Sequence, residues 1–249
     1  MDVLETDEFA HTGATLIADA IRANPRAVIV AATGNTPMSI YQALAEMYRA
    51  GAFSTGELRV VQLDAYAGIP VDDRRSLFRW MAESFCAPLE IPVANVIRLP
   101  GDAADPEAAC RIYAETVHAM GGFDLAILGL GPNGHLGFNE PPADASAPTR
   151  VVSLSEESLN SNAAYWGGRA QVPTQALTCG MDLLLAAKQT LLVVSGSHKR
   201  AMLARTLDGP VTAALPASFL HHASNVTVLA DRAAAEGLRG SEQRHLERP

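Results

Sequence analysis

The chain has 249 residues, a length that fits one large domain or two small ones and allows a substantial buried core. Hydrophobic residues make up 48% of the chain and charged residues 18%, a balance typical of a compact globule and not of a disordered chain. The formal net charge of −8 argues against a general affinity for nucleic acid or for an anionic membrane surface.

Short apolar runs alternate with helical patterns along the chain. The apolar runs predict strands at 26–32, 58–63, 95–99, 123–128, 190–194 and 225–230. Helical spacing of apolar residues predicts helices at about 38–48, around 77–85, at 106–120 and at 198–207. Strands that are apolar at nearly every position are covered on both faces. The pattern therefore predicts an α/β fold, with an open, mostly parallel sheet flanked by helices on both faces in a Rossmann-like arrangement.

We find no internal repeat and no linker, so we expect a single α/β domain over residues 1–239. The polar stretch at 240–249 is expected to be a flexible C-terminal tail. The three cysteines lie far apart without a CxxC pair, the acidic start lacks a signal-peptide core, and no apolar run approaches the ~18 residues of a membrane span. We therefore expect a cytoplasmic protein without a disulfide framework or a zinc site.

Ligands of open α/β sheets bind beyond the carboxyl ends of the strands. The residues at two of the predicted strand ends favour the binding of an anion. Thr33, Gly34, Asn35 and Thr36 lie between a strand and a helix, whose free N–H groups and positive dipole end suit a phosphate. Lys199 lies where another strand turns into a helix, and a cation there is unfavourable to the dipole unless an anion joins it. Taken alone, the loop fits an unliganded helix start equally well, and Lys199 fits a solvated surface lysine better than a ligand-binding one.

Candidate acid–base groups follow two other strands. Asp64 ends the second predicted strand and can accept a proton if it is partly buried, although an aspartate in a turn is more common there. His135 and Glu140 stand five residues apart in the glycine-rich stretch GLGPNGHLGFNEP at 129–141. The carboxylate can fix the tautomer of the ring and support its charged form. Because no three-ligand spacing occurs, we expect no metal site.

Four segments carry a resemblance to a known family: ATGNTP at 32–37, LDAYAGIP at 63–70, the 129–141 stretch and SGSHK at 195–199. In this order they resemble the amino-sugar-phosphate deaminases, which include glucosamine-6-phosphate deaminase and its galactosamine-6-phosphate relative. The similarity covers about residues 10–230. These enzymes share an open α/β sheet with the 6-phosphogluconolactonases, in which the stretch after Gly-His lacks the Asn-Glu-Pro found here at 139–141.

The resemblance implies a reaction without metal or organic cofactor. His135 would open the sugar ring, with Glu140 and Asn133 holding and polarising its imidazole. Asp64 would move a proton from C2 to C1, and water would then release ammonia and leave a 2-keto hexose 6-phosphate. Residues 33–36 and Lys199 would hold the phosphate. The implied partner is a small sugar phosphate, with no nucleic acid or membrane, and a homo-oligomer remains possible.

The chain departs from the family pattern at several positions. Many members carry Asp where this chain has Asn133, and Glu where it has Ala65. An Arg that many glucosamine enzymes present to the phosphate is absent from 160–166, and Arg169 or Arg200 are candidates to replace it. These differences look nearer to the galactosamine branch and leave the sugar open. Some hexameric members of the family have an allosteric site for an N-acetyl sugar, and its basic residues are mostly absent from this chain. Arg150 is the only clear candidate for such a residue, so simple kinetics are expected.

Two alternatives remain open at this level. A 6-phosphogluconolactonase would use the same fold, with His135 as the base that activates water. A non-catalytic sugar-phosphate sensor would bind the same ligand without turnover. The deaminase is favoured because of the Asn-Glu-Pro at 139–141.

Overall fold

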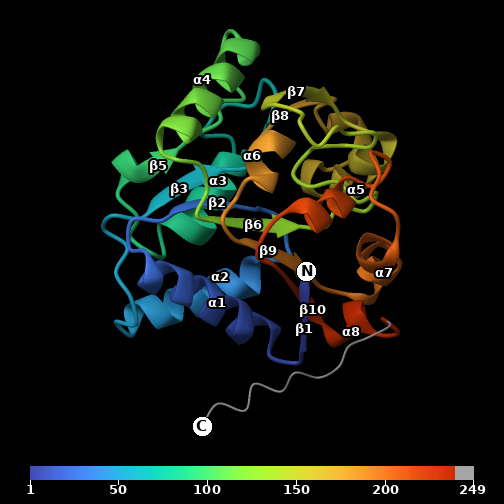
Figure 1. Ribbon diagram of the computed structural model, residues 1–249. Helices are drawn as coiled ribbons and strands as arrows, with labels where there is room; N and C mark the ends of the chain where they lie inside the picture. Colours follow the sequence, from blue (N-terminus) through green and yellow to red (C-terminus); the bar gives the residue numbers. More distant parts are fainter. Residues whose placement is uncertain (239–249) are drawn as a thin grey trace.

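The structure, a computed structural model, describes residues 1–238, so the tail expected at 240–249 lies outside the described residues. Within them, a seven-stranded parallel sheet has the order β1-β10-β9-β6-β2-β3-β5 (Figure 1). Its strands are β1 (Asp2–Thr6), β2 (Val28–Ala31), β3 (Arg59–Gln62), β5 (Val96–Ile97), β6 (Leu125–Gly129), β9 (Thr190–Val194) and β10 (Val226–Asp231).

Helices cover both faces of this sheet, as the apolar strands predicted (Figure 1). Along β2, Ile29 and Ala31 pack into the core with α1 (Phe9–Ala23) and α2 (Met38–Arg49). Val28 and Val30 point into the opposite core. That second core is completed by α4 (Pro106–Ala119), α6 (Met181–Leu185), α7 (Arg200–Asp208) and α8 (Arg232–Ala235).

The strand order reverses between β2 and β6, because the chain builds outward from β2 through β3 and from β6 through β9. Ala31 of β2 lies opposite Gln62 of β3 and Ile127 of β6, so the carboxyl ends of these strands are nearly level. The reversal leaves room for a ligand beyond those ends. The expected α/β architecture is therefore confirmed.

A second, three-stranded antiparallel sheet was not predicted. It has the order β4-β8-β7 and consists of β4 (Asp64–Tyr66), β8 (Gln175–Thr178) and β7 (Arg150–Ser153). Asp64 therefore begins a new strand rather than ending the previous one. This sheet packs with α3 (Leu77–Met81) and α5 (Glu156–Trp166) around a small aromatic core of its own.

Short elements complete the described chain. A π-helical turn (Ala82–Cys86) continues α3, and 3-10 turns occur at Val93–Asn95, Arg169–Gln171, Ser197–Lys199 and Pro216–His222. Among the described helices, none has both the length and the apolar character needed to cross a bilayer.

Candidate active site

A cavity of about 790 Å³ opens at the strand ends where the sheet order reverses. It is bounded by the segments that follow β2, β3, β6 and β9, and by α3 and α5. The residues predicted from sequence that line it are Thr33, Gly34, Asn35, Thr36, Asp64, His135 and Lys199. The other two predicted residues, Asn133 and Glu140, lie behind the His135 imidazole and contact it or its backbone.

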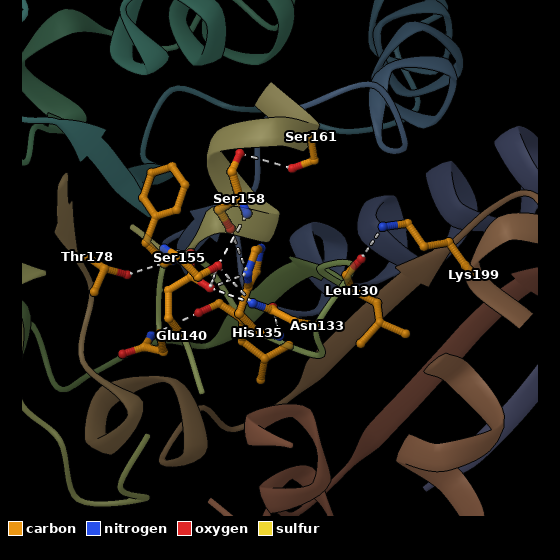
Figure 2. Close-up of polar contacts among 12 residues, drawn as sticks. Leu130, Asn133, His135, Glu140, Ser155, Ser158, Ser161, Thr178 and Lys199 are labelled. Carbon is orange, nitrogen blue, oxygen red and sulfur yellow. Dashed lines mark hydrogen bonds and ion pairs between the residues drawn. The ribbon is translucent and has the colours of Figure 1, made fainter. Parts of the chain in front are cut away.

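The His135 ring is held by a carboxylate, as Figure 2 shows. Its Nδ1 lies 3.3 Å from Oε2 of Glu140, and the Ser158 hydroxyl is 3.4 Å from the same ring nitrogen. Glu140 is itself fixed, because its Oε2 accepts hydrogen bonds from Nδ2 of Asn133 at 2.6 Å and from the Ser155 hydroxyl at 3.0 Å. These bonds leave the Nε2 edge of the ring as the part available to a ligand.

Glu140 is an anion over the whole physiological range. Burial opposes its ionisation, but the hydrogen bond and charge of His135, together with the Asn133 amide, outweigh burial and hold its pKa at about 2. A fixed negative charge next to Nδ1 stabilises the imidazolium and orients the ring. The site can therefore support a His135 that takes up and gives back a proton.

Glycines and one buried amide shape the loop that carries His135. Gly131 lies so close to the imidazole that a Cβ on it would overlap the ring, and Gly134 adopts φ +82°, which disfavours other residues. Asn139 is fully buried and donates to the carbonyls of Leu136 and Cys179, both at 2.9 Å. The loop is therefore tied to β8 and the small sheet, which explains its glycine and asparagine content.

Arg150, the residue singled out as a candidate for an allosteric site, takes part in the same support. It is half-buried on β7, and its guanidinium donates to Oδ1 of Asn139 at 2.9 Å. Burial lowers its pKa from the usual arginine value. The contact connects the small antiparallel sheet to the His135 loop.

Asp64 lies at the start of β4 with only 7% of its surface exposed. Among the described residues, no hydrogen-bond donor reaches its carboxylate, and burial raises its pKa to about 7. A carboxyl group with such a pKa can exchange a proton near neutrality. The structure thus gives the two predicted carboxylates opposite environments, one always ionised and one able to titrate.

The loops that follow β2 and β9 also line the cavity. Gly34 has φ +90° and open space around it, and α2 begins four residues later. The Lys199 ammonium donates to the carbonyl of Leu130 at 2.8 Å, and burial lowers its pKa (Figure 2). The turn before Lys199 is fixed by Asp231, whose carboxylate accepts from the Ser195 hydroxyl at 2.6 Å and from the Gly196 amide at 2.9 Å.

Neither proposed replacement for the missing arginine lines the cavity. Arg169 pairs with Glu156, and Arg200 pairs with Glu236 and donates to the Ala233 carbonyl. The arginines that do line it are Arg74 and Arg75, on the segment between β4 and α3. Sequence reasoning missed them because nothing local marks that segment as part of the site.

Sequence reasoning also missed the aromatic wall and the serines of the cavity. Trp166 lies edge-on to Tyr66 with ring centroids 5.0 Å apart, and Trp80 lies edge-on to Tyr165 at 5.3 Å. These side chains come together through tertiary packing and have no motif of their own. The lining residues absent from the prediction include Tyr66, Arg74, Arg75, Trp80, Ser161, Asn162, Tyr165, Trp166 and His198.

Among residues 1–238, no group of three or more His, Cys, Asp or Glu side chains could hold a metal ion. Cys179 is completely buried and burial raises its pKa to about 12, so its thiol stays protonated at neutral pH. Cys179 is therefore a packed small residue rather than a nucleophile.

The family described as glucosamine-6-phosphate isomerases/6-phosphogluconolactonase matches residues 5–229 of the chain. A glucosamine-6-phosphate deaminase of Bacillus velezensis is 37% identical over 93% of this chain and 96% of its own length. One from Streptomyces coelicolor is 37% identical over 92% of this chain and 90% of its own length.

Solved structures agree with these relatives. The structure of a monomeric glucosamine-6-phosphate deaminase has a TM-score of 0.92 at 37% identity, over 94% of this chain and 99% of that one. The 6-phosphogluconolactonase of Trypanosoma brucei shares the fold, with a TM-score of 0.76 at 21% identity over 95% of this chain and 98% of that one. The chain therefore belongs to the family of glucosamine-6-phosphate isomerases and 6-phosphogluconolactonases.

Proposed function

We propose that this protein is an amino-sugar-phosphate deaminase. It converts glucosamine-6-phosphate or galactosamine-6-phosphate and water into the 2-keto hexose 6-phosphate and ammonia. Relatives at 37% identity over most of the chain are named glucosamine-6-phosphate deaminase, which favours this activity over lactone hydrolysis. The observation that carries the proposal is that Asp64, the His135–Glu140 pair and the 33–36 loop with Lys199 meet at one cavity.

Ring opening is assigned to His135. Its Nε2 edge would move a proton between the anomeric hydroxyl and the ring oxygen, giving the open-chain aldehyde. The transient imidazolium is stabilised by the Glu140 carboxylate on Nδ1, which Asn133 and Ser155 hold in place. A positioned acid–base group of this kind typically accelerates the reaction ~10²–10⁴-fold.

Isomerisation is assigned to Asp64. The ionised carboxylate would take the proton from C2 and return it to C1, so that the amine-bearing C2 becomes an imine. Water adds to this imine, the C2–N bond breaks, and ammonia leaves while C2 becomes a carbonyl. A base held in a poorly solvated place, with no protein donor to its oxygens, is well suited to a carbon-bound proton.

The phosphate is assigned to residues 33–36 and Lys199, which line the cavity. Binding energy from this remote group helps to orient the reacting carbons. The proposed chemistry uses no metal and no organic cofactor. Three buried free cysteines support the proposal that the protein acts in the cytoplasm. Its state as a monomer or homo-oligomer is decided by analytical ultracentrifugation at several concentrations.

The proposal is tested by measuring ammonia release from glucosamine-6-phosphate and galactosamine-6-phosphate in parallel, with 6-phosphogluconolactone hydrolysis as a third assay. Ammonia from at least one amino sugar, lost on Asp64→Asn, is the expected result. Lactone hydrolysis without ammonia release identifies the lactonase instead. Tight binding of sugar phosphate without turnover in any assay identifies a sensor.

A further inference from the structure

The segment between β4 and α3 brings two arginines, Arg74 and Arg75, to the cavity. The two differ in what already engages them. The Arg75 guanidinium makes a two-pronged contact with Asp73, at 2.9 and 2.7 Å, and lies 4.5 Å from the ring centroid of Trp166. Asp73 neutralises the charge of Arg75, and the guanidinium lies over the Trp166 ring. Arg75 therefore forms part of the cavity wall and is not available to bind a ligand.

Arg74 makes no contacts of this kind within the described residues. The residue lines the cavity and is exposed, and no ion pair or hydrogen bond of its guanidinium occurs among residues 1–238. By contrast, Arg79 in the following helix pairs with Glu83 and donates to the Asp72 carbonyl. Arg74 is thus a lining residue whose guanidinium has no partner within the described chain, and the same lining contains the anion-suited loop.

Side-chain contacts connect this segment to the anion-suited loop. Trp80, on α3, donates its Nε1 hydrogen to the Met38 sulfur at 3.2 Å, at the start of α2. Trp80 also packs edge-on against Tyr165, whose hydroxyl lies beside the side chain of Asn35. The arginine-bearing segment is therefore packed, through α3 and α5, against the loop at 33–36.

Lys199 is the other cation considered for the phosphate, and it is the one lysine in the lining. The Leu130 carbonyl occupies one of its three hydrogen-bond donors. A phosphate group carries up to two charges near neutral pH and accepts several hydrogen bonds. A guanidinium matches such a group with two parallel hydrogen bonds, which an ammonium cannot supply.

We propose that Arg74 is a further substrate-binding residue, which holds the phosphate of the amino sugar together with Lys199 and the 33–36 loop. This assignment rests on the proposed function for the identity of the ligand. It does not need turnover, because the group recognised is a phosphate monoester or inorganic phosphate.

The test is isothermal titration calorimetry of the whole chain with inorganic phosphate and with sorbitol 6-phosphate, an acyclic hexitol phosphate that cannot react. Arg74→Ala is expected to raise both dissociation constants about 10- to 100-fold, the range for losing a hydrogen bond to a charged group. Arg74→Lys is expected to recover only part of this loss, because it restores the charge but not the planar fork. Circular dichroism checks that each variant is folded.

Arg111→Ala is the matched control, since it removes one exposed positive charge from α4 outside the cavity lining. If Arg74→Ala weakens binding no more than Arg111→Ala does, the assignment is overturned. If phosphate binding depends on Arg74 but no amino sugar releases ammonia, the proposed function fails while the assignment stands. If ammonia is released and Arg74→Ala binds phosphate like the control, the assignment fails alone.

Discussion

At the scale of single residues, the two carboxylates of the site differ in what surrounds them. Asp64 has no protein donor within the described chain and burial raises its pKa to about 7, whereas donors from His135 and Asn133 hold the pKa of Glu140 at about 2. A base must be ionised to accept a proton, while the support for the imidazole must be ionised at every working pH. The environments match the two proposed roles, acceptor for Asp64 and fixed anion for Glu140.

This difference predicts the pH dependence of the reaction. Below about pH 7 Asp64 becomes protonated, so kcat/KM for the amino-sugar phosphate should fall tenfold per pH unit on the acid side. Steady-state rates between pH 5 and 9 give the midpoint. The binding of the unreactive monoester sorbitol 6-phosphate over the same range is the control, because the phosphate of a monoester itself titrates near pH 6. An acid limb centred near pH 4, as for an exposed aspartate, contradicts the role given to Asp64.

The sequence predicted the site residues that stand directly at strand ends. Asp64, His135 and the 33–36 loop follow apolar runs, and parallel strands bring their carboxyl ends to one edge. Arg74 and Trp166 were out of reach, because they enter the cavity through the packing of α3 and α5 against the small sheet. No local pattern encodes such a long-range contact.

At the scale of elements, the loop between β6 and β7 is shaped around the His135 ring. A Cβ at Gly131 would overlap the imidazole, whereas Gly56 has open space around it. Gly131→Ala should therefore displace the ring from Glu140 and reduce kcat at least 100-fold, with the fold retained. Gly56→Ala, the control, should leave kcat within twofold. Steady-state kinetics with circular dichroism measure both, and an active Gly131→Ala enzyme contradicts the geometry of the loop.

Helix α5 is coupled to the same loop through its N-cap. The Ser155 hydroxyl accepts from the Ser158 amide at 3.2 Å and donates to Glu140 at 3.0 Å. Asp105 caps α4 in the same way, accepting from the Ala108 amide at 2.9 Å. Loss of either cap should cost about 1 kcal/mol of unfolding free energy.

The two cap variants should differ in activity. Ser155→Ala should lower kcat about 3- to 30-fold, because Glu140 loses a donor, whereas Asp105→Ala should leave kcat unchanged. Urea unfolding and steady-state kinetics on both proteins make the comparison. Equal effects on kcat would mean that Ser155 acts on stability alone.

The strands missed from the sequence are short or lie at edges, whereas α1 and α5, for which no range was predicted, are helices of 15 and 11 residues. β1 is an edge strand with the charged residues Asp2 and Glu5, so it lacks the apolar run of a central strand. β4, β7 and β8 have at most four residues each, and β7 is partly exposed, which leaves too few positions to establish a period. The buried strands of the large sheet, such as β9, were predictable because nearly every residue is apolar.

At the scale of the whole molecule, the site costs stability. The pKa of Asp64 is higher in the folded chain than the ordinary value of 3.8 to which it returns on unfolding, so the folded state binds more protons between about pH 4 and pH 7. The stabilisation that protonated Asp64 contributes is fully present below about pH 4 and is lost as the pH rises through 7. Keeping Asp64 ionised at pH 8 is thus a cost that the fold bears for a reactive base.

Replacing the base should reverse this cost. Asp64→Asn cannot ionise, so it should be more stable than the natural sequence by about 1–4 kcal/mol at pH 8, with a smaller difference at pH 5. Urea unfolding at both pH values measures the change. A variant whose advantage is the same at pH 5 and pH 8 would show that Asp64 is not held at a raised pKa.

The proton that moves from C2 to C1 can be followed directly, with an amino-sugar 6-phosphate carrying deuterium at C2 as substrate. Magnetic resonance of the product locates the label. Transfer by Asp64 predicts a 2-keto hexose 6-phosphate with the deuterium at C1 or exchanged into the solvent, and no product from Asp64→Asn. An aldose phosphate that keeps its deuterium at C2, formed by direct replacement of the amine, would contradict the mechanism.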